Sequence, residues 1–498
     1  MNYYMGVDLG GTVVKASLFD AIGRELGSAG RSTGLIAEEP GQAERDIEAV
    51  RKLTYEAIRE ALEAASIPGS RVTALATTGH GKGLYTIKRD GTPGVGIVST
   101  DTRSRDVAAS IAGADDFDEF VYARTLQPFW AAHTAPILVW LKEHRPDRYE
   151  EIGHILLAKD LLRFFLTDRV AVEKTDLSGT GLWNNVNPGI DQEILDRLGI
   201  PEIGEAIPEI FDSHDIAGSV TDEAAAETGL AAGTPVVAGL FDVNACALAT
   251  GLEREDELTA VVGTWSISEF VSDDVSRAIE AGERYVIQAH SVPGQWMVHE
   301  ASPTSASNLE WFTATLLPDI PKEERFEYCN KVVAETPKTG VTFFPFLFGD
   351  DLGADASGTF WGLRAGTDRA QIIRAVYEGI VFQHARHMNK LLQVTKPPKQ
   401  IRLAGGATRS EVWMRMFADV FGLPVTVSTA TELGALGAAI CAAIGVGEYR
   451  SYGEAMKAMT SVRASYEPDE ERGAALRKKQ VDFDQAVREM APIWSRHA

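Results

Sequence analysis

The sequence predicts an α/β protein made of two similar domains of comparable size, with a cleft between them. Its 498 residues are enough chain for two domains with full cores. Strand-like and helix-like segments alternate throughout, and a strand, a glycine turn and a second strand occur both at the start and near the midpoint. We therefore expect domains at 1–253 and 254–498, separated within the charged stretch 251–257.

The first half opens with two strand-like runs around a glycine turn. Residues 3–9 and 13–19 are the runs, and Gly10-Gly11-Thr12 is the turn. Apolar residues then recur at helical spacing in 46–66, and another strand is expected at 72–77. Helical patterning returns at 136–144 and, in mixed form, at 160–166.

The second half repeats this layout. Strands are expected at 258–262 and 266–271, with Gly263-Thr264 as the turn between them. Helices are expected at 305–316, 369–391 and about 410–420, and a short strand at 401–403. The recurrence is the reason for predicting two related domains rather than one large one.

Composition and charge exclude several classes of partner. The chain has 48 basic and 71 acidic residues, a formal net charge of −23. This excess of acid would repel nucleic acid and anionic membranes, although a small anion responds only to local charge. The three cysteines have no zinc or disulfide spacing, and no apolar run is long enough to span a membrane. We expect a protein of the reducing cytoplasm.

The first candidate site is the turn that follows Asp8. Gly10 and Gly11 leave backbone N–H groups open to an anion, while Thr12 adds a hydroxyl and Lys15 a positive charge. Asp8, at the strand end, could hold Mg²⁺ through water. The alternative is a plain β-hairpin with a glycine turn. Asp, Thr and Lys at this spacing favour phosphate.

The second candidate is Asp242, which follows an apolar run and precedes a helix-like segment. One interpretation is a helix N-cap, a position that Asp fills well. The other is a general base: the helix dipole would keep the carboxylate ionised, ready to accept a proton from an attacking hydroxyl.

Weaker signals lie in the second half. Gly263-Thr264 could be a second phosphate loop or only a turn. Gly405-Gly406 ends a strand just before a helix, where adenine or a diphosphate could lie against backbone. The stretch 358–378 has the pattern of a strand, a loop and an amphipathic helix, and by itself indicates core packing.

Together, these motifs in this order resemble the FGGY carbohydrate kinases of the actin-like ATPase superfamily, over nearly the whole chain. The stretch 358–378 fits the family's second signature at each constrained position, which are Gly358, Phe360, Gly362, Leu363, Gln371, Ile372, Ala375, Val376, Tyr377 and Glu378. The first signature is imperfect, because its tryptophan is present as Trp140 but its lysine is replaced by Ile137. The resemblance implies two actin-like (ribonuclease H-like) domains with a catalytic cleft between them.

Within the family, the chain looks most like the L-xylulose (3-keto-L-gulonate) kinase branch. This likeness rests on the stretches 81–84, 239–243, 263–265, 299–305 and 308–312. His80 departs from it, since that branch has glutamine at a point where family members contact sugar hydroxyls. Imidazole and amide form hydrogen bonds of different reach and number, so the identity of the sugar stays open.

The resemblance implies phosphoryl transfer from ATP, with Mg²⁺, to a hydroxyl of a small ketose such as L-xylulose. Asp242 would be the general base, and His80, Asp101, Arg103 and Trp130 would contact the sugar. Asp101 and Arg103 could instead be a structural ion pair, and Trp130 a core residue. The expected ATP, phosphate and metal contacts are Asp8 for the metal and Gly10, Gly11, Thr12, Lys15, Gly263, Thr264, Gly405, Gly406, Ala407 and Glu411 for ATP and its phosphates.

Three alternatives stay open. The first is a polyol kinase for erythritol, a pentitol or glycerol. The departure at His80 is the feature that leaves this alternative open. The second is an actin-like ATPase or chaperone that acts on a protein partner. The third is an inactive sugar sensor, although Asp8, Thr12, Asp242 and Thr264 are all intact. Because dimers are common in the family, a homodimer is one expected assembly.

Overall fold

A computed structural model describes residues 2–114, 116–263, 265–349 and 356–496. The chain forms two compact units, each assembled from three stretches of sequence. The first unit contains Met1–Glu253, Ser272–Met297 and Glu432–Ser461; the second contains Arg254–Val271, Val298–Thr431 and Val462–Ala498. The chain first passes between the units after Glu253, and two later stretches, 272–297 and 432–461, belong again to the first unit.

The first unit is built on a six-stranded mixed sheet with the order β12-β13-β4-β1-β2-β3. Strand β1 is antiparallel to β2 and parallel to β4, which is in turn parallel to β13. The strands are β1 (Tyr3–Leu9), β2 (Val13–Asp20), β3 (Glu25–Ser32), β4 (Val72–Gly79), β12 (Ile216–Ser219) and β13 (Pro235–Phe241). The opening strand pair and its glycine turn are therefore confirmed.

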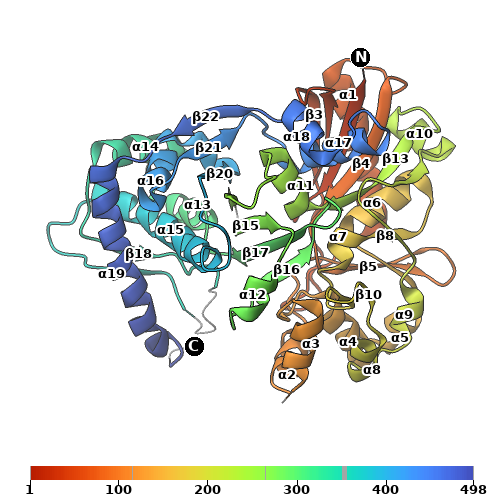
Figure 1. Cartoon of the computed structure of the whole chain (residues 1–498), viewed down its shortest axis with the longest axis horizontal. Coiled ribbons are helices and arrows are strands. Elements are labelled where there is room, and N and C mark those ends of the chain that lie inside the picture. Colours follow the sequence, from red (N-terminus) through yellow and green to blue (C-terminus); the bar gives the residue numbers. More distant parts are fainter. Residues whose placement is uncertain (1, 115, 264, 350–355, 497–498) are drawn as a thin grey trace. The chain divides into compact units, whose positions relative to one another are not determined.

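Helices cover both faces of this sheet. Met5 and Val7 belong to the core shared with α1 (Ile47–Ala65) and α6 (Ala158–Thr167). Gly6 between them points to the opposite face, where a Cβ would lie 1.9 Å from the carbonyl oxygen of Ala435. That residue belongs to α17 (Leu433–Gly445), which lies against β1 although more than four hundred residues separate them in sequence (Figure 1).

A second, smaller core lies beside the main sheet within the first unit. It is formed by the sheet β6-β5-β7 and the helices around it. Its elements are β5 (Leu84–Lys88), β6 (Pro93–Ile97), β7 (Ile152–Leu156), α2 (Arg105–Ala112), α3 (Phe117–Thr125), α4 (Thr134–His144), α5 (Pro146–Glu150), α8 (Gln192–Arg197) and α9 (Ile203–Ala206). The other elements of the unit are β8 (Ala171–Glu173), α7 (Lys174–Leu177), β9 (Trp183–Asn184), β10 (Gly189–Ile190), β11 (Glu209–Phe211), α10 (Asp222–Thr228), α11 (Asp242–Thr250), α12 (Ser276–Glu280), β16 (Val286–Ala289) and α18 (Tyr452–Met459).

Six strands of a seven-stranded sheet, in the order β17-β15-β14-β20-β21-β22, repeat the plan of the first sheet in the second unit. Here β14 is antiparallel to β15 and parallel to β20. In the first sheet, β1 is likewise antiparallel to β2 and parallel to β4. The strands are β14 (Glu257–Val262), β15 (Ser266–Ser272), β17 (Trp296–Ser302), β20 (Gln400–Ala404), β21 (Val425–Ser428) and β22 (Val462–Tyr466). The predicted α/β architecture of two related halves is confirmed.

Five longer helices accompany this second sheet. The helix α15 (Arg369–Leu391) has the predicted bounds and begins in a capping box, in which Asp368 and Gln371 bond each other's backbone. The other helices are α13 (Ser307–Leu316), α14 (Arg325–Glu335), α16 (Glu411–Phe421) and α19 (Glu470–Trp494), and the small strands are β18 (Thr342–Phe344) and β19 (Thr359–Trp361). In the described part of the chain, no helix is both long and apolar enough to cross a bilayer.

Candidate active site

Three of the predicted site residues lie at one edge of the first sheet. Asp8 is near the end of β1, His80 follows β4, and Asp242 follows β13. In the strand register, Gly79 is opposite both Leu9 and Phe241. Since the three strands run in the same direction, their carboxyl ends meet at this edge, where α/β sheets commonly hold ligands. We call this edge the Asp242 edge.

A bulge in β13 sets the direction in which Asp242 leaves the sheet. The register with β4 shifts between Val237 and Leu240. Gly239 there has φ +86°, and a Cβ on it would lie 2.0 Å from the carbonyl oxygen of Thr77. Only glycine fits that conformation and that approach. Asp242 then becomes the first residue of α11.

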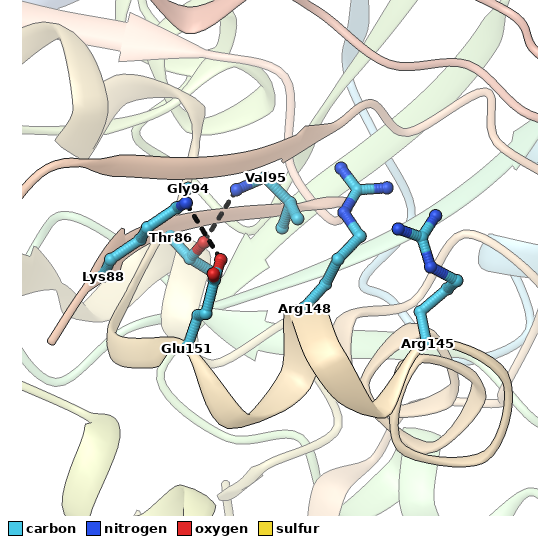
Figure 2. A pocket seen from close by; sticks show the side chains of 7 residues that line it. All are labelled: Thr86, Lys88, Gly94, Val95, Arg145, Arg148 and Glu151. Atoms are coloured by element: carbon cyan, nitrogen blue, oxygen red, sulfur yellow. Dashed lines mark hydrogen bonds and ion pairs between the residues drawn. The ribbon is translucent and has the colours of Figure 1, made fainter.

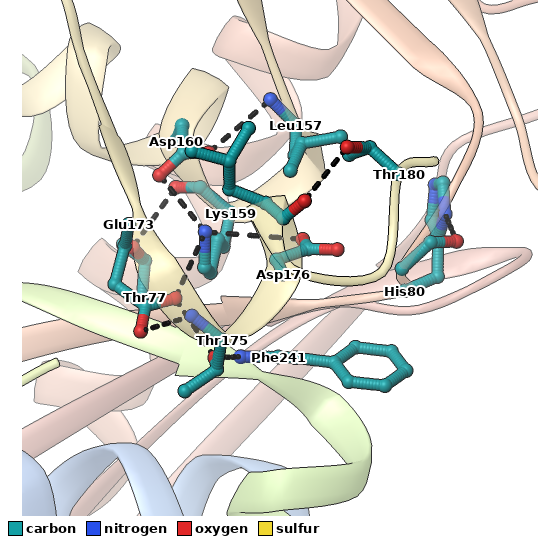
Figure 3. Close-up of polar contacts among 12 residues, drawn as sticks. Thr77, His80, Leu157, Lys159, Asp160, Glu173, Thr175, Asp176, Thr180 and Phe241 are labelled. Carbon is teal, nitrogen blue, oxygen red and sulfur yellow. Dashed lines mark hydrogen bonds and ion pairs between the residues drawn. The ribbon is translucent and has the colours of Figure 1, made fainter. Parts of the chain in front are cut away.

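Beneath this turn lies a wholly buried cluster of charges, shown in Figure 3. Lys159 Nζ is 2.9 Å from Asp160 Oδ1, 3.4 Å from Glu173 Oε2 and 3.8 Å from Asp176 Oδ2. Neighbouring negative charges keep the pKa of Lys159 above its usual value despite burial. Arg163, also wholly buried, pairs with Asp160 at 2.9 Å, so three carboxylates share two cations in this cluster.

The cluster reaches the Asp242 turn through Thr175. Glu173 accepts hydrogen bonds from the N–H and the hydroxyl of Thr175, both at 2.8 Å. The Thr175 hydroxyl oxygen accepts in turn from the backbone N–H of Phe241, at 3.0 Å. The residue before Asp242 is thus tied to the buried charges.

The Asp242 carboxyl is held in a state that favours proton uptake. Burial raises its pKa well above the usual value, and the negative charges of Asp8 and Asp176 add to this. The Val243 N–H and the Lys82 ammonium act in the opposite direction. We expected the helix dipole to keep this group ionised; burial and like charge outweigh it, because both disfavour the carboxylate.

Asp8 has an oxygen that fits a metal ligand. Its Oδ1 is buried and makes no hydrogen bond with any described residue, and burial raises the pKa of Asp8 to about 6. Such an oxygen suits Mg²⁺, which keeps several waters and takes few protein ligands. Among the described residues, no group of three His, Cys, Asp or Glu side chains could hold a metal ion by itself.

The first glycine turn joins β1 to β2 beside Asp8. The Gly10 N–H donates to the Val13 carbonyl at 3.0 Å, which closes the turn. The Cβ position of Gly11 has no atom within 4 Å, so this side of the turn is open. Thr12 is exposed in the same turn, and Lys15 forms an ion pair of 2.9 Å with Glu432.

His80 is a buried neutral side chain with partners on both ring nitrogens. Its Nε2 lies 3.0 Å from the Tyr85 hydroxyl and 3.4 Å from Arg45, and its Nδ1 lies 3.3 Å from the Gly81 carbonyl. Burial, reinforced by the charge of Arg45, lowers the pKa of His80 to about 3. A direct hydrogen bond from His80 to a sugar requires one of these contacts to change.

The other proposed sugar residues are placed as follows. Asp101 and Arg103 form a buried ion pair of 2.8 Å, and Arg103 also pairs with Glu44 at 2.7 Å. This is the structural ion pair that the sequence allows as the alternative to substrate contact, and contact with the substrate stays a prediction. Trp130 is 38% exposed, so it is not a core residue, and its contact with the sugar stays a prediction.

Lys82 belongs to the stretch 81–84 that carries part of the family likeness, but the sequence predicted no role for it in the site. It is buried, and its Nζ lies 4.9 Å from the centre of the Phe241 ring and 5.5 Å from that of Trp130. Burial lowers its pKa to about 8, against the carboxylates of Asp176 and Asp242, which raise it. The available signal was a lysine between two glycines just beyond a strand end.

The candidates of the second unit gather where β14 and β20 end. Gly405 has φ +94°, and a Cβ on it would lie 2.6 Å from the Val262 carbonyl and 3.2 Å from Gly263 N. Gly263 and the Gly405-Gly406 corner are therefore adjacent. Ala407 is buried, while Glu411 begins α16 and pairs with Arg415 at 2.6 Å. Thr264 lies outside the described residues.

A histidine for which the sequence predicted no role supports this second turn. Ser266 Oγ lies 2.9 Å from His384 Nδ1, and Ser305 Oγ lies 3.0 Å from His384 Nε2. The Ala306 N–H also donates to the Gly263 carbonyl at 2.9 Å. Burial lowers the pKa of His384 to about 3, so its neutral ring links the turn to the stretch before α13.

Comparison with known protein families supports what the two sheets suggest. Residues 3–249 match the N-terminal domain of the FGGY family of carbohydrate kinases, and residues 258–446 match its C-terminal domain. The chain belongs to the FGGY family. It is therefore a carbohydrate kinase with the actin-like ATPase fold, as the resemblance implied.

Individual relatives agree with this assignment. The chain is 38% identical to the L-xylulose/3-keto-L-gulonate kinase of Escherichia coli over 92% of this chain and 91% of that one. It is 36% identical to a probable L-xylulose kinase of Pasteurella multocida over 90% of this chain and 92% of that one. The solved structure of a xylulose kinase from Rhodospirillum rubrum has 26% identity and a TM-score of 0.88, and covers 99% of each chain.

One surface pocket of this FGGY kinase is connected to Arg103 only through Glu44, which pairs with both Arg103 and Arg148. It has a volume of about 230 Å³ and is lined by Thr86, Lys88, Gly94, Val95, Arg145, Arg148 and Glu151 (Figure 2). Its cations are already paired, Lys88 with Glu151 at 2.9 Å and Arg148 with Glu44 at 2.7 Å. No proposed catalytic residue lines it.

Proposed function

We propose that this FGGY kinase transfers the γ-phosphoryl group of ATP to a primary hydroxyl of a small ketose, L-xylulose or a close relative. Asp242 takes the proton of that hydroxyl as its oxygen bonds to phosphorus and the bond to the leaving ADP oxygen breaks. The observation that carries the proposal is the position of Asp242 beside Asp8 and the open Gly11 turn, with a carboxyl poised to take up a proton.

The phosphate contacts follow from the two glycine turns. Gly10, Gly11, Thr12 and Lys15 supply donors beside Asp8, and Gly263 and Thr264 supply the corresponding turn of the second unit. Mg²⁺ near Asp8 would offset phosphate charge. We assign the nucleotide mainly to the second unit, at Gly405, Gly406, Ala407 and Glu411, and the sugar to the first, at His80, Asp101, Arg103 and Trp130.

The choice of sugar rests on the relatives, two of which are named for L-xylulose. The test is ADP release from Mg-ATP against a panel of ketoses and polyols. A preference for L-xylulose or 3-keto-L-gulonate supports the proposal. A preference for erythritol, a pentitol or glycerol would instead identify a polyol kinase. ATP hydrolysis whose rate does not change with any sugar would favour an actin-like ATPase. Absence of ADP release with every compound would favour an inactive sugar sensor.

A further inference from the structure

A buried arginine of the first unit contacts the first glycine turn. Arg45 is 4% exposed, and its Nη2 donates a hydrogen bond of 2.7 Å to the carbonyl oxygen of Gly10. Its backbone is fixed as well, because the Arg45 N–H donates to the carbonyl of Gly96 in β6, also at 2.7 Å. The phosphoryl transfer described above gives Arg45 no role.

The hydrogen bond to Gly10 sets the direction of the next backbone N–H. The carbonyl of Gly10 and the N–H of Gly11 belong to one planar trans peptide group, so they point in opposite directions. With the carbonyl held by Arg45, the Gly11 N–H points away from that side chain. It donates to no acceptor among the described residues, and Gly11 itself is exposed. An exposed, unpaired N–H in a glycine turn is a donor that a phosphate oxygen can accept from.

The guanidinium of Arg45 has no counter-charge in the part of the chain that the structure describes. Its other contacts are with neutral groups, since Nη1 donates to the Tyr85 hydroxyl at 3.1 Å and lies 3.4 Å from His80 Nε2. The Nε–H has no described hydrogen-bond partner. Glu44, the carboxylate next to Arg45 in the sequence, is already paired with two other arginines. A buried charge without a counter-ion is costly, and an anion bound nearby would offset that cost.

We propose that Arg45 is a positioning residue for phosphoryl transfer, which turns the Gly11 N–H towards the transferred phosphoryl group. The negative charge of that group then balances the buried guanidinium. The inference rests on the proposed function. A backbone donor that is oriented in advance stabilises the charge of the transition state without reorganisation. Arginine suits this task, because it stays charged when buried and can bond a carbonyl and a hydroxyl at the same time.

A purely structural role for Arg45 makes a different prediction. If the side chain only completed the packing beside β5, its loss would lower stability and activity together. An unpaired buried charge behaves otherwise, because its replacement by an apolar side chain of similar length is often neutral or stabilising. Water can also reach the Gly10 carbonyl, since this residue is only half-buried. The stability and the turnover of a variant therefore separate the two roles.

The first test is Arg45→Met, measured with Mg-ATP and the best sugar of the panel. We expect kcat to fall roughly 10- to 100-fold, the usual effect of a misplaced donor at the reacting group. The KM of the sugar should change less than about threefold, and the melting temperature without ligands should not fall. Arg169→Met is the matched control, because Arg169 pairs with Glu209 at the surface at 2.7 Å, and it should leave kcat and KM unchanged.

Free guanidinium ion provides a second test in Arg45→Ala, whose shortened side chain leaves room for it. Millimolar guanidinium chloride should raise the kcat of this variant severalfold and leave that of wild type unchanged. Urea has a similar shape but no charge, and it should restore no activity. Wild-type kcat in Arg45→Met would overturn the role of Arg45, as would a loss of kcat that is matched by a fall in melting temperature and not recovered by guanidinium. Absence of any sugar phosphorylation by wild type would instead overturn the proposed function and this role with it.

Discussion

The backbone N–H of Phe241 donates a hydrogen bond to the hydroxyl of Thr175, at a distance of 3.0 Å. This contact links the residue before Asp242 to Glu173, which accepts two bonds from Thr175 and lies 3.4 Å from Lys159. The N-cap residue of α11 is Phe241, whose side chain makes no capping hydrogen bond, so the buried cluster of charges helps to position the start of this helix.

Thr175→Val should weaken both stability and turnover. It removes the acceptor of a buried N–H, which costs about 1–3 kcal/mol in the free energy of unfolding. It also frees the turn before Asp242, so we expect kcat to fall by roughly tenfold. Urea unfolding and initial rates measure the two effects. Thr175→Ser keeps the hydroxyl and should stay close to wild type; if it loses as much kcat as the valine variant, the hydrogen bond is not the cause.

Asp242→Asn should abolish most turnover while ATP binding is kept. Loss of a general base lowers kcat by about 10²- to 10⁴-fold, whereas the proposed nucleotide contacts belong to the other unit. Steady-state rates and calorimetric titration with ATP measure these quantities. Asp222→Asn is the matched control, since Asp222 is also the first residue of a helix but is exposed. Full activity in Asp242→Asn would exclude the base.

The same carboxyl should set the acid limb of the pH profile. The base must be ionised to accept a proton, and burial with Asp8 and Asp176 raises its pKa well above the usual value. The wild-type kcat/KM should therefore begin to fall at a higher pH than an ordinary aspartate would cause. The residual rate of Asp242→Asn should lack this limb; an identical limb in the variant would assign it to another group.

Asp8→Asn should stabilise the protein at neutral pH and inactivate it. The folded-state pKa of Asp8 is about 6 against 3.8 for an ordinary aspartate. The stability contributed by the protonated form is full below that lower value and is lost as pH rises through about 6. In the absence of Mg²⁺, the free energy of unfolding of the variant should therefore exceed that of wild type by up to roughly 3 kcal/mol at pH 7. At pH 4 the two free energies of unfolding should differ little. A difference that does not change with pH would contradict this.

His80→Gln should be tolerated. The histidine is neutral, and its contacts with Tyr85 and the Gly81 carbonyl can be made by an amide, which both donates and accepts. We expect a change in kcat of less than roughly tenfold and a loss of about 1 kcal/mol in stability. Initial rates and thermal unfolding check this. A large rise in the KM of the sugar, with kcat and stability unchanged, would show that His80 contacts the substrate directly.

Much of the fold could be predicted because its signals are local. Each signal reflects contacts within a few residues, as in the strand-like run 3–9, the helical spacing in 46–66 and the glycines between strand pairs. The elements β1, α1 and β14 begin and end close to where we expected. Asp8 and Asp242 could be singled out as well, because each stands at the end of an apolar run.

Other site features could not be predicted. Lys82, Asp176 and Asp242 have no common spacing in the sequence, and they come together only because three separate segments pack at the ends of β4 and β13. The return of α17 to the first unit is similar, since the fit of Gly6 against Ala435 is a property of two surfaces and not of either segment.

The sequence by itself therefore determined the strands, helices and turns, the duplicated plan and the residue types available for phosphoryl transfer. Only the tertiary structure decided their ionisation and their partners. Asp101 and Arg103 pair with each other, His80 is neutral, and Asp242 is pushed towards its protonated form instead of being held ionised by its helix. The reason is that pKa values and buried hydrogen bonds depend on desolvation and on charges from distant segments, which no local pattern records.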